Sequence, residues 1–373
     1  MAAVLVVGAG VIGLACGYHL AEQGHSVQLV DTGSTGASWV AAGMLAPVSE
    51  AGFGEGHLTR LNLAAVPAFG RFATELERRT GQPVGLRAEG TLVVAFNADD
   101  RAVLDRLSAY REALGLSAER LTGSAVRALE PYLAPSVRAG VLARGDLSVD
   151  NRRYLGALAA GGRLAGVATV TGEVTSLIRD GSVVSGVRLA DGTELPAEVV
   201  LLCSGAATQA LVEVGVRPVK GQILRLTVPE RLGVVLRHTV RGLIRGSEVY
   251  LVPRTGGEIV VGASSEDQGF DTTVTAGAVY ELLRDAAELL PVSSELALTE
   301  ASAGSRPGTA DNGPLLGWYQ PGLLVATGHY RNGILLSALT AEAVGTLLAG
   351  GRPAVEWKPF DARRFSQPPS ASA

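Results

Sequence analysis

The feature that most constrains the fold of this chain is a glycine-punctuated turn near its start, GAGVIG at residues 8–13. The all-apolar run 3–7 before the turn is typical of a strand buried on both faces. After the turn, apolar residues recur at helical spacing over 11–23, and Gly24 is a typical helix-ending residue. A second buried strand, 26–30, ends at Asp31. The segment therefore predicts one complete βαβ unit.

This turn has the spacing of a dinucleotide-binding fingerprint. Gly8 permits the tight turn, Gly10 lets the backbone approach a pyrophosphate, and Gly13 allows the helix to pack on the strand. The N–H groups at the start of the helix then face the phosphate charge. Asp31, eighteen residues after Gly13, is placed for the hydroxyls of the adenosine ribose.

Composition excludes several classes of protein. The 373 residues are 47% hydrophobic and 18% charged, which is enough apolar material for two cores, and the net charge of −4 gives no basic field for nucleic acid. Cys16 and Cys203 are expected to be small buried hydrophobes, and the histidines lack metal-ligand spacing, so we expect no metal. Neither a signal peptide nor a membrane span is indicated, and we expect a cytosolic protein.

The turn alone does not distinguish NAD from FAD, because enzymes of both kinds share it. Two observations favour FAD. The segment 323–333 is a buried strand and a glycine-punctuated turn that opens a helix, which favours an anion, and the C2 carbonyl of a flavin gains negative charge on reduction. No second GxGxxG follows a strand, as a flavin reductase that uses NADPH would usually need. A nicotinamide dehydrogenase and a non-catalytic flavin- or NAD-binding module stay as alternatives.

Signals of a parallel sheet return over 199–203 and 322–327, whereas 217–263 holds short alternating runs that indicate an antiparallel meander. We predict an α/β fold, with a Rossmann-type FAD-binding domain of the glutathione-reductase kind and an inserted antiparallel-sheet substrate domain. The expected boundaries are 1–82, 141–216 and 300–366 for the FAD-binding domain, 83–140 and 217–299 for the substrate-binding domain, and 367–373 for a flexible tail. Further helices are expected over 57–80, 99–114, 152–166 and 332–348, with a strand over 89–96.

Several stretches resemble the amino-acid oxidase superfamily of flavoproteins, which includes D-amino-acid and sarcosine oxidases, and within it the bacterial glycine oxidase (ThiO) family. They are VVGAGVIG at 6–13, AAGML at 41–45, PVKG at 218–221, YLVPR at 250–254, RPGT at 306–309 and GHYRNGILL at 328–336. The likeness covers essentially the whole chain. The last two stretches together are specific to this group, whereas the first is common to many flavoproteins.

This resemblance implies that Arg306 holds the substrate carboxylate with the help of Tyr250. The chemistry agrees, because a planar guanidinium offers a bidentate fork and a tyrosine hydroxyl adds a third donor. Arg331 and Met44 are further candidates for the substrate pocket. A plain core tyrosine stays as the alternative for Tyr250, and a salt bridge elsewhere as the alternative for Arg331.

The resemblance also implies the contacts of a non-covalent FAD. The stretch 42–44 should pass the isoalloxazine, 37–38 should lie nearer the pyrophosphate, and the loop 329–335 should contact the flavin chiefly through backbone groups. Val174 should meet the adenine through its backbone, unless it is an ordinary strand valine. The full set of expected cofactor-binding residues is Gly8, Gly10, Val11, Ile12, Gly13, Asp31, Thr32, Ala37, Ser38, Ala42, Gly43, Met44, Val174, Gly205, Gly328, His329, Tyr330, Arg331, Asn332, Gly333, Ile334 and Leu335.

The chain departs from the glycine oxidase pattern near the expected substrate end. Glu248 stands where the pattern has a histidine, Ser265 lies near a position that can carry a methionine, and Ser305 replaces a leucine. These differences concern the specificity for the amine and leave the flavin site and the carboxylate-binding arginine in place.

The implied reaction is oxidation of glycine or another small or N-alkyl amino acid. Hydride would move to flavin N5, O2 would be reduced to hydrogen peroxide, and the imine would give an oxo acid and ammonia. No catalytic side chain is nominated, because positioning is the main contribution of the protein. The alternatives are a dehydrogenase that passes electrons to a quinone or carrier, and an oxidase for a larger amino acid. We expect a homo-oligomer with no nucleic-acid or membrane partner, and a thiamine role follows only from the resemblance.

Overall fold

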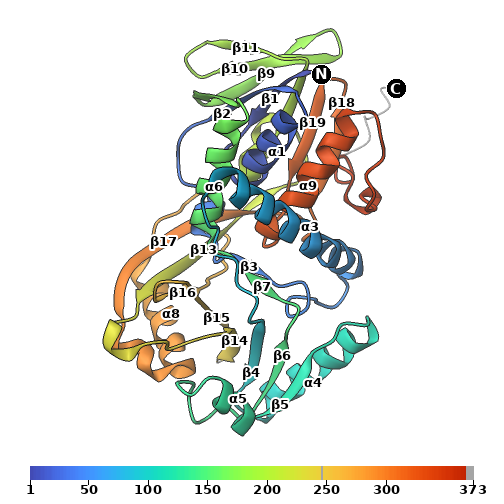
Figure 1. Cartoon of the computed structure of the whole chain (residues 1–373). Helices are drawn as coiled ribbons and strands as arrows, with labels where there is room; N and C mark the ends of the chain where they lie inside the picture. Colours follow the sequence, from blue (N-terminus) through green and yellow to red (C-terminus); the bar gives the residue numbers. More distant parts are fainter. Residues whose placement is uncertain (245–246, 367–373) are drawn as a thin grey trace.

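The computed structural model describes residues 1–244 and 247–366, which form two large sheets (Figure 1). The first sheet has the strand order β18-β19-β12-β1-β2-β8, and every neighbouring pair is parallel except β18 and β19. The second has the order β17-β13-β16-β15-β14-β4-β6-β5 and is antiparallel except where β14 meets β4. The predicted α/β fold, with a parallel nucleotide-binding sheet and a mostly antiparallel second sheet, is confirmed.

The central strands of the first sheet are made of small and medium apolar residues and are buried on both faces. The strands are β1 (Ala3–Val7), β2 (Ser26–Asp31), β8 (Ala168–Thr171), β12 (Val199–Leu202), β18 (Leu315–Gln320) and β19 (Leu323–Thr327). Helices α1 (Val11–Glu22), α3 (Gly56–Thr80), α6 (Asn151–Leu164) and α9 (Gly333–Leu348) cover one face. A small antiparallel sheet of β9 (Val174–Asp180), β10 (Val183–Leu189) and β11 (Glu194–Pro196) covers the other.

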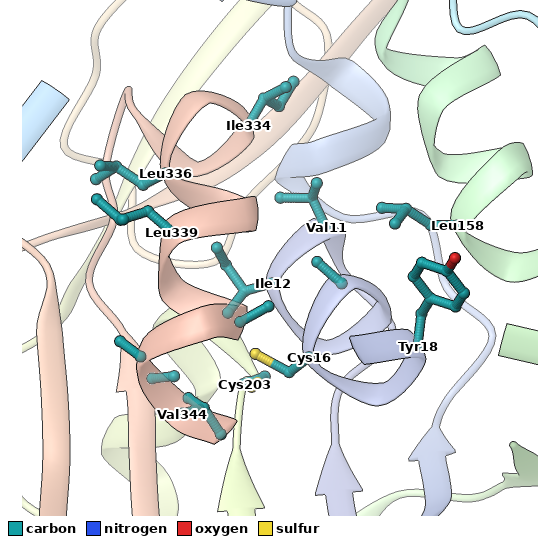
Figure 2. Packing of buried hydrophobic residues seen from close by; sticks show 14 of the residues in the cluster. Val11, Ile12, Cys16, Tyr18, Leu158, Cys203, Ile334, Leu336, Leu339 and Val344 are labelled. Carbon is teal, nitrogen blue, oxygen red and sulfur yellow. The ribbon is translucent and has the colours of Figure 1, made fainter. Parts of the chain in front are cut away.

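The largest hydrophobic cluster lies between this parallel sheet and its helices (Figure 2). Helix α1 packs against α9 and α6, and Cys16 of α1 and Cys203 beyond β12 are buried there as free thiols. Their predicted role as small buried hydrophobes agrees with this position. Helix α9 is apolar on nearly every side, as expected for a helix enclosed by other elements.

The second sheet is built mainly from the middle of the chain. Its strands are β4 (Thr91–Ala95), β5 (Glu119–Thr122), β6 (Ala139–Ala143), β13 (Arg217–Thr227), β14 (Thr239–Ile244), β15 (Ser247–Pro253), β16 (Glu258–Gly262) and β17 (Ala297–Gly308). Helix α8 (Ala276–Leu289) buries its apolar stripe against one face, and Thr275 caps its start by accepting a hydrogen bond from the N–H of Ala278. Helices α4 (Ala98–Ala113) and α5 (Gly123–Leu129) pack beside β4–β6. The opposite face of the sheet is therefore left to contact the nucleotide-binding part.

The connecting segment after β2 forms short elements that join the two sheets. These are α2 (Ala37–Val40) and β3 (Met44–Leu45), and β3 pairs with β7 (Leu147–Ser148). Side chains from this segment pack on the second sheet in a small cluster that includes Val40, Ala42 and Ile223. The segment thus bridges the parallel sheet and the open face of the second one.

Most predicted elements are confirmed to within a few residues. The sequence pattern does not predict α5, α8, β5, β6, β17, β18 or the small β9–β11 sheet, and it does not single out β14 within the meander expected over 217–263. The strands of the small sheet carry many exposed polar residues, so their hydrophobic pattern is weak. Two expected domain boundaries, at 140/141 and 299/300, fall inside β6 and β17, and the division into domains stays a prediction. The expected tail 367–373 lies outside the described residues. Within the described ranges, no helix has the length and apolar character to cross a membrane.

Candidate active site

A continuous cavity of about 1510 Å³ is lined by both ends of the expected site. Asp31 and Val174 line it on the side of the parallel sheet, and Arg306 and Tyr250 line it on the side of the second sheet. Small-molecule pockets commonly measure about 300–1,000 Å³. This cavity therefore has room for a dinucleotide and a small substrate together.

The glycine turn is required by close contacts between backbone segments. A Cβ atom on Gly8, which has φ of 103°, would lie 2.8 Å from the carbonyl oxygen of Cys203. A Cβ atom on Gly13 would lie 1.8 Å from the carbonyl oxygen of Gly8. Asp31 holds the turn from the neighbouring strand, because its carboxylate accepts hydrogen bonds of 2.7 Å from the N–H groups of Ala9 and Gly33. Each carboxylate oxygen keeps a second lone pair, which fits a ribose hydroxyl.

The start of α1 faces the cavity without a side-chain cap at Gly10. The N–H of Val11 donates to Ser38 Oγ at 3.0 Å, which places α2 beside the first turn of the helix. A Cβ atom on Gly10 would lie 3.3 Å from the same oxygen. The lack of a capping side chain at Gly10 and the small size of this residue fit the approach of a pyrophosphate.

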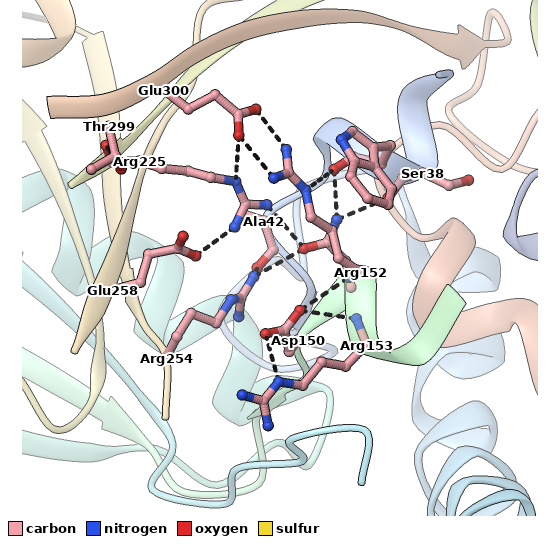
Figure 3. A network of polar contacts seen from close by, with 12 residues as sticks. Ser38, Ala42, Asp150, Arg152, Arg153, Arg225, Arg254, Glu258, Thr299 and Glu300 are labelled. Carbon is pink, nitrogen blue, oxygen red and sulfur yellow. Dashed lines mark hydrogen bonds and ion pairs between the residues drawn. The ribbon is translucent and has the colours of Figure 1, made fainter. Parts of the chain in front are cut away.

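A polar network holds the segment that is expected to pass the flavin (Figure 3). Asn151 Nδ2 donates to the carbonyl oxygens of Ser38 at 2.9 Å and Trp39 at 2.8 Å. Arg254 Nη2 donates to the carbonyl oxygen of Ala42. Because the donors come from α6 and from the end of β15, this short segment is fixed from both sheets. A pre-formed backbone of this kind suits a tightly bound cofactor.

One further ion pair and one glycine hold this part of the structure together. Arg152 makes a bidentate ion pair with Glu300, with distances of 2.8 and 2.6 Å, and so ties α6 to β17. A Cβ atom on Gly43, which has φ of 69°, would lie 2.0 Å from the carbonyl oxygen of Val149. The segment that is expected to pass the isoalloxazine therefore needs glycine at this position.

The C-terminal turn contributes a buried histidine. His329 Nε2 lies 3.0 Å from Thr340 Oγ1, while His329 Nδ1 is buried with no hydrogen-bond partner among the described residues. Burial lowers the pKa of His329 to about 3, so the imidazole is neutral. A buried nitrogen without a hydrogen-bond partner destabilises the protein unless a ligand supplies that partner. This nitrogen belongs to a side chain that lines the cavity. The orphaned nitrogen and the glycine turns both fit a bound dinucleotide.

The register of the second sheet places the expected substrate-binding side chains on one face. Arg306 lies opposite Val219 in the β17–β13 pair, two residues from Gly221. On β13, Gly221 lies two residues before Ile223, so the two residues share one face of the strand. Ile223 lies opposite Gly262 of β16, and Gly262 lies opposite Tyr250 of β15. Arg306 and Tyr250 therefore project from the same face into the same cavity.

Two glycines make room for these side chains. A Cβ atom on Gly221 would lie 2.3 Å from Arg306 Nη1, and a Cβ atom on Gly262 would lie 2.4 Å from Tyr250 Oη. The guanidinium and the phenol thus lie flat over the backbone of β13 and β16. Any larger residue at 221 or 262 would displace them.

The electrostatics of this end favour an anion. Arg306 Nη1 donates to the carbonyl oxygen of Ser264 at 3.2 Å, and no carboxylate of the described residues lies within 4.0 Å of its guanidinium. Burial raises the pKa of Tyr250 although the Arg306 charge acts in the opposite direction, so the hydroxyl remains a donor. Arg331 packs its guanidinium over the ring of Tyr330, 5.1 Å from its centroid, and also lines the cavity.

All expected substrate-binding residues and most expected cofactor-binding residues line this cavity. The exceptions are Gly13, Gly328, Asn332 and Leu335. Gly13 is packed on Gly8, Gly328 on Thr309, and Leu335 is 1% exposed in the core, so these residues shape the site from behind. The roles of the lining residues in binding stay predictions.

Sequence reasoning missed several residues of the cavity wall. The most important are Glu50, Arg241 and Ser264 at the substrate end and Gly221 and Gly262 beneath it. Gly221 lies inside the PVKG stretch that carries the family resemblance, but the sequence does not show that this glycine makes room for Arg306. Arg241 lies on β14, a strand that the sequence pattern does not single out within the meander expected over 217–263.

The chain belongs to a known family of flavoproteins. Residues 3–347 match the DAO family, described as FAD dependent oxidoreductase. The chain is 35% identical to glycine oxidase of Geobacillus kaustophilus over an alignment of 372 positions that covers 97% of this chain and 96% of that protein. It is 32% identical to the bifunctional protein ThiO/ThiG of a Synechocystis strain, over 97% of this chain and 54% of that protein.

The solved structures agree with this assignment. The crystal structure of glycine oxidase from Geobacillus kaustophilus matches with a TM-score of 0.90 and 33% identity, covering 97% of this chain and 98% of that chain. The resemblance predicted from the sequence motifs is confirmed, and so is FAD as the cofactor of the family. The chain is therefore an FAD-dependent oxidoreductase related to glycine oxidase.

Proposed function

We propose that this protein oxidises glycine or another small amino acid, N-alkyl amino acids included, and uses O2 as the electron acceptor. The observation that carries the proposal is the guanidinium of Arg306, which lies in the cavity beside Tyr250 and has no carboxylate partner among the residues that the structure describes. Such an arginine is suited to hold a substrate carboxylate. The relatives named glycine oxidase support glycine as the amine.

In this scheme, the protein contributes by holding the substrate in position. Arg306 binds the carboxylate through two N–H groups, and the Tyr250 hydroxyl donates a third hydrogen bond. FAD, when bound, would supply the oxidant: it would accept one hydride, which carries two electrons, and pass both electrons to O2. The balanced outcome is one amino acid, one O2 and one water converted to an oxo acid, hydrogen peroxide and ammonia, or the alkylamine where the substrate is an N-alkyl amino acid. No side chain has to remove a proton from carbon.

The finer parts of the proposal rest on the same site. We propose that the FAD is held non-covalently, by the turns at Gly8 and Gly43 and by the loop around His329. A role in thiamine biosynthesis is proposed from the likeness to a ThiO/ThiG protein. A cytosolic location and a homo-oligomer stay predictions.

The test is an assay of hydrogen peroxide with glycine, sarcosine, D-alanine, D-proline and larger amino acids. We expect peroxide from glycine and the small substrates, and release of the flavin into the supernatant when the protein is precipitated by acid. Turnover with a dye under anaerobic conditions, but no peroxide in air, would instead show a dehydrogenase. Glycine ranking far below a bulky amino acid would contradict a glycine oxidase activity.

A further inference from the structure

A second guanidinium at the substrate end, that of Arg241, has no part in the proposed function. Arg241 lies opposite Tyr250 in the β14–β15 pair, and Glu248 is two residues before Tyr250 on the same strand. Residues in these positions project from one face of a sheet. Arg241 Nη1 donates to Glu50 Oε1 and Nη2 donates to Glu248 Oε2, each at 3.0 Å. All three side chains line the cavity.

The backbone around Glu50 is fixed from two sides. Buried Arg111 donates from Nη2 to the carbonyl oxygen of Ser49 and from Nε to that of Ala51. Buried Asp146 accepts hydrogen bonds from the N–H groups of Val48 and Ser49, at 2.9 and 3.1 Å. Glu50 is therefore held in place rather than drawn in by Arg241. Burial alone would lower the pKa of Arg241, but the carboxylates of Glu50 and Glu248 raise it.

The charges around Tyr250 determine how many substrate carboxylates the pocket accepts. The charges that act most strongly on its hydroxyl include those of Arg306, Glu50, Arg241 and Arg331, and Glu248 contacts Arg241. Glu50 and Glu248 both pair with Arg241, whereas Arg306 has no carboxylate of the described residues within 4.0 Å, and Glu266 and Glu281 add further negative charge to the cavity wall. One substrate carboxylate can therefore pair with Arg306. A second carboxylate would bring unbalanced negative charge into a region where the side chains of Glu50 and Arg241 are only 15% and 12% exposed.

We infer that Glu50 and Glu248 occupy Arg241, so that the pocket accepts amino acids with one carboxylate and rejects those with a second. The inference rests on the proposed function, because it takes Arg306 as the residue that binds the first carboxylate. Of the two glutamates that contact Arg241, Glu248 is the one whose charge can be removed with less effect on stability. Its side chain is 66% exposed, and an exposed ion pair contributes little to stability. Without the Glu248 charge, Nη2 of Arg241 becomes available to a second substrate carboxylate.

The experiment compares butyrate with succinate, two acids of equal chain length that carry one and two carboxylates. Each is titrated into the holoenzyme, and the change in absorbance of the bound flavin gives the dissociation constant. We expect the unmodified protein to bind butyrate more tightly than succinate. Glu248→Gln should tighten succinate by about tenfold, the size of one charge-assisted hydrogen bond, and change butyrate less than about twofold.

Two matched variants separate a specific contact from a general charge effect. Glu281→Gln removes the same charge from an exposed residue of the cavity wall on α8. Glu281 makes no hydrogen bond or ion pair with Arg241 within the described part of the chain, so this variant should leave the ratio of succinate to butyrate affinity unchanged. The double variant Glu248→Gln/Arg241→Gln should lose the gain in succinate binding. Both variants keep Arg306 and the flavin turns intact.

The outcomes that overturn the inference differ from those that overturn the proposed function. Equal affinity of the unmodified protein for both acids contradicts the inference, and so does a gain for succinate that Glu281→Gln reproduces. Unchanged discrimination in Glu248→Gln also contradicts it, while butyrate binding shows that the carboxylate-binding site is sound. Failure of butyrate to bind at all contradicts the role of Arg306 in the proposed function, and the inference fails with it.

Discussion

The two ends of the cavity are built in different ways. At the cofactor end, backbone groups make most of the site, and its most crowded glycines face other backbone atoms: Gly13 faces the Gly8 carbonyl and Gly43 faces the Val149 carbonyl. At the substrate end, side chains make the site, and Gly221 faces the Arg306 guanidinium. A backbone contact cannot be relieved without moving the fold, whereas a side chain can rotate away. Substitutions at the cofactor end should therefore disrupt the local structure and flavin binding. Substitutions at the substrate end should lower only the rate of the reaction.

The largest effect is expected from Gly13→Ala at the cofactor end. Its Cβ atom would lie 1.8 Å from the Gly8 carbonyl oxygen, whereas real Cβ atoms stay beyond 3.0 Å, so the turn or the helix has to move. We expect the purified protein to contain almost no flavin, measured as flavin absorbance per mole of protein. Gly70→Ala in α3 is the control, because its Cβ atom meets nothing within 4 Å and alanine favours a helix. Full flavin content in Gly13→Ala would show that the turn tolerates a side chain.

A smaller effect, confined to the reaction, is expected from Gly221→Ala at the substrate end. The new methyl group would displace the Arg306 guanidinium, so kcat/KM for glycine should fall by about tenfold to a hundredfold while the flavin stays bound. Arg306→Ala sets the limit for this effect, since loss of a charged hydrogen-bonding partner commonly costs about 2–5 kcal/mol. Loss of flavin from Gly221→Ala would erase the proposed difference between the two ends. An unchanged kcat/KM would show that Arg306 is free to move without cost.

The smallest effect concerns His329, which lies between the two ends. Its pKa is lowered from 6.5 to about 3 by burial, so between these values the unfolded chain binds a proton that the folded protein does not. The free energy of unfolding should therefore fall as pH drops below about 6.5, by about 2 kcal/mol at pH 5. Denaturant unfolding of the holoprotein at pH 7.5 and pH 5 measures this difference.

The matched control for this prediction is a histidine at the surface. His329→Asn should reduce the difference between the two pH values, whereas His57→Asn, at an exposed position of α3, should keep it. Equal pH dependence in both variants would show that protonation of other groups dominates the loss of stability.

The cofactor end was predictable because its signals are local. The GAGVIG turn, the strand before it, the helix after it and Asp31 all lie within one short segment, and the structure confirms each of these elements. The glycine spacing together with the strand, the helix and Asp31 indicated a dinucleotide, and the C-terminal turn around His329 and the lack of a second such turn added the preference for FAD. Four of the predicted residues, including Gly13 and Leu335, do not line the cavity, because spacing does not tell which side of a turn faces a ligand.

The substrate end depends on distances along the chain that no local pattern records. Arg306, Tyr250 and Arg241 come from three strands, and only the register of β17, β13, β16, β15 and β14 brings them to one face. Motif resemblance identified Arg306 and Tyr250, but it missed Arg241, and it identified Glu248 only as a departure from the family. Hydrophobic alternation gives the face of each strand but not which strands become neighbours.

By itself, the sequence determined the βαβ unit and the class of cofactor, because these follow from spacing within a segment and from the chemistry of the turns. Arg306 and Tyr250 were nominated to bind a carboxylate by resemblance to a family, and that role stays a prediction. Tertiary structure alone decided that Gly221 and Gly262 make room for Arg306 and Tyr250, and that Glu50 and Glu248 meet on Arg241. The physical reason is that pairing between distant strands and the balance of charge in a buried pocket are set only when the chain folds.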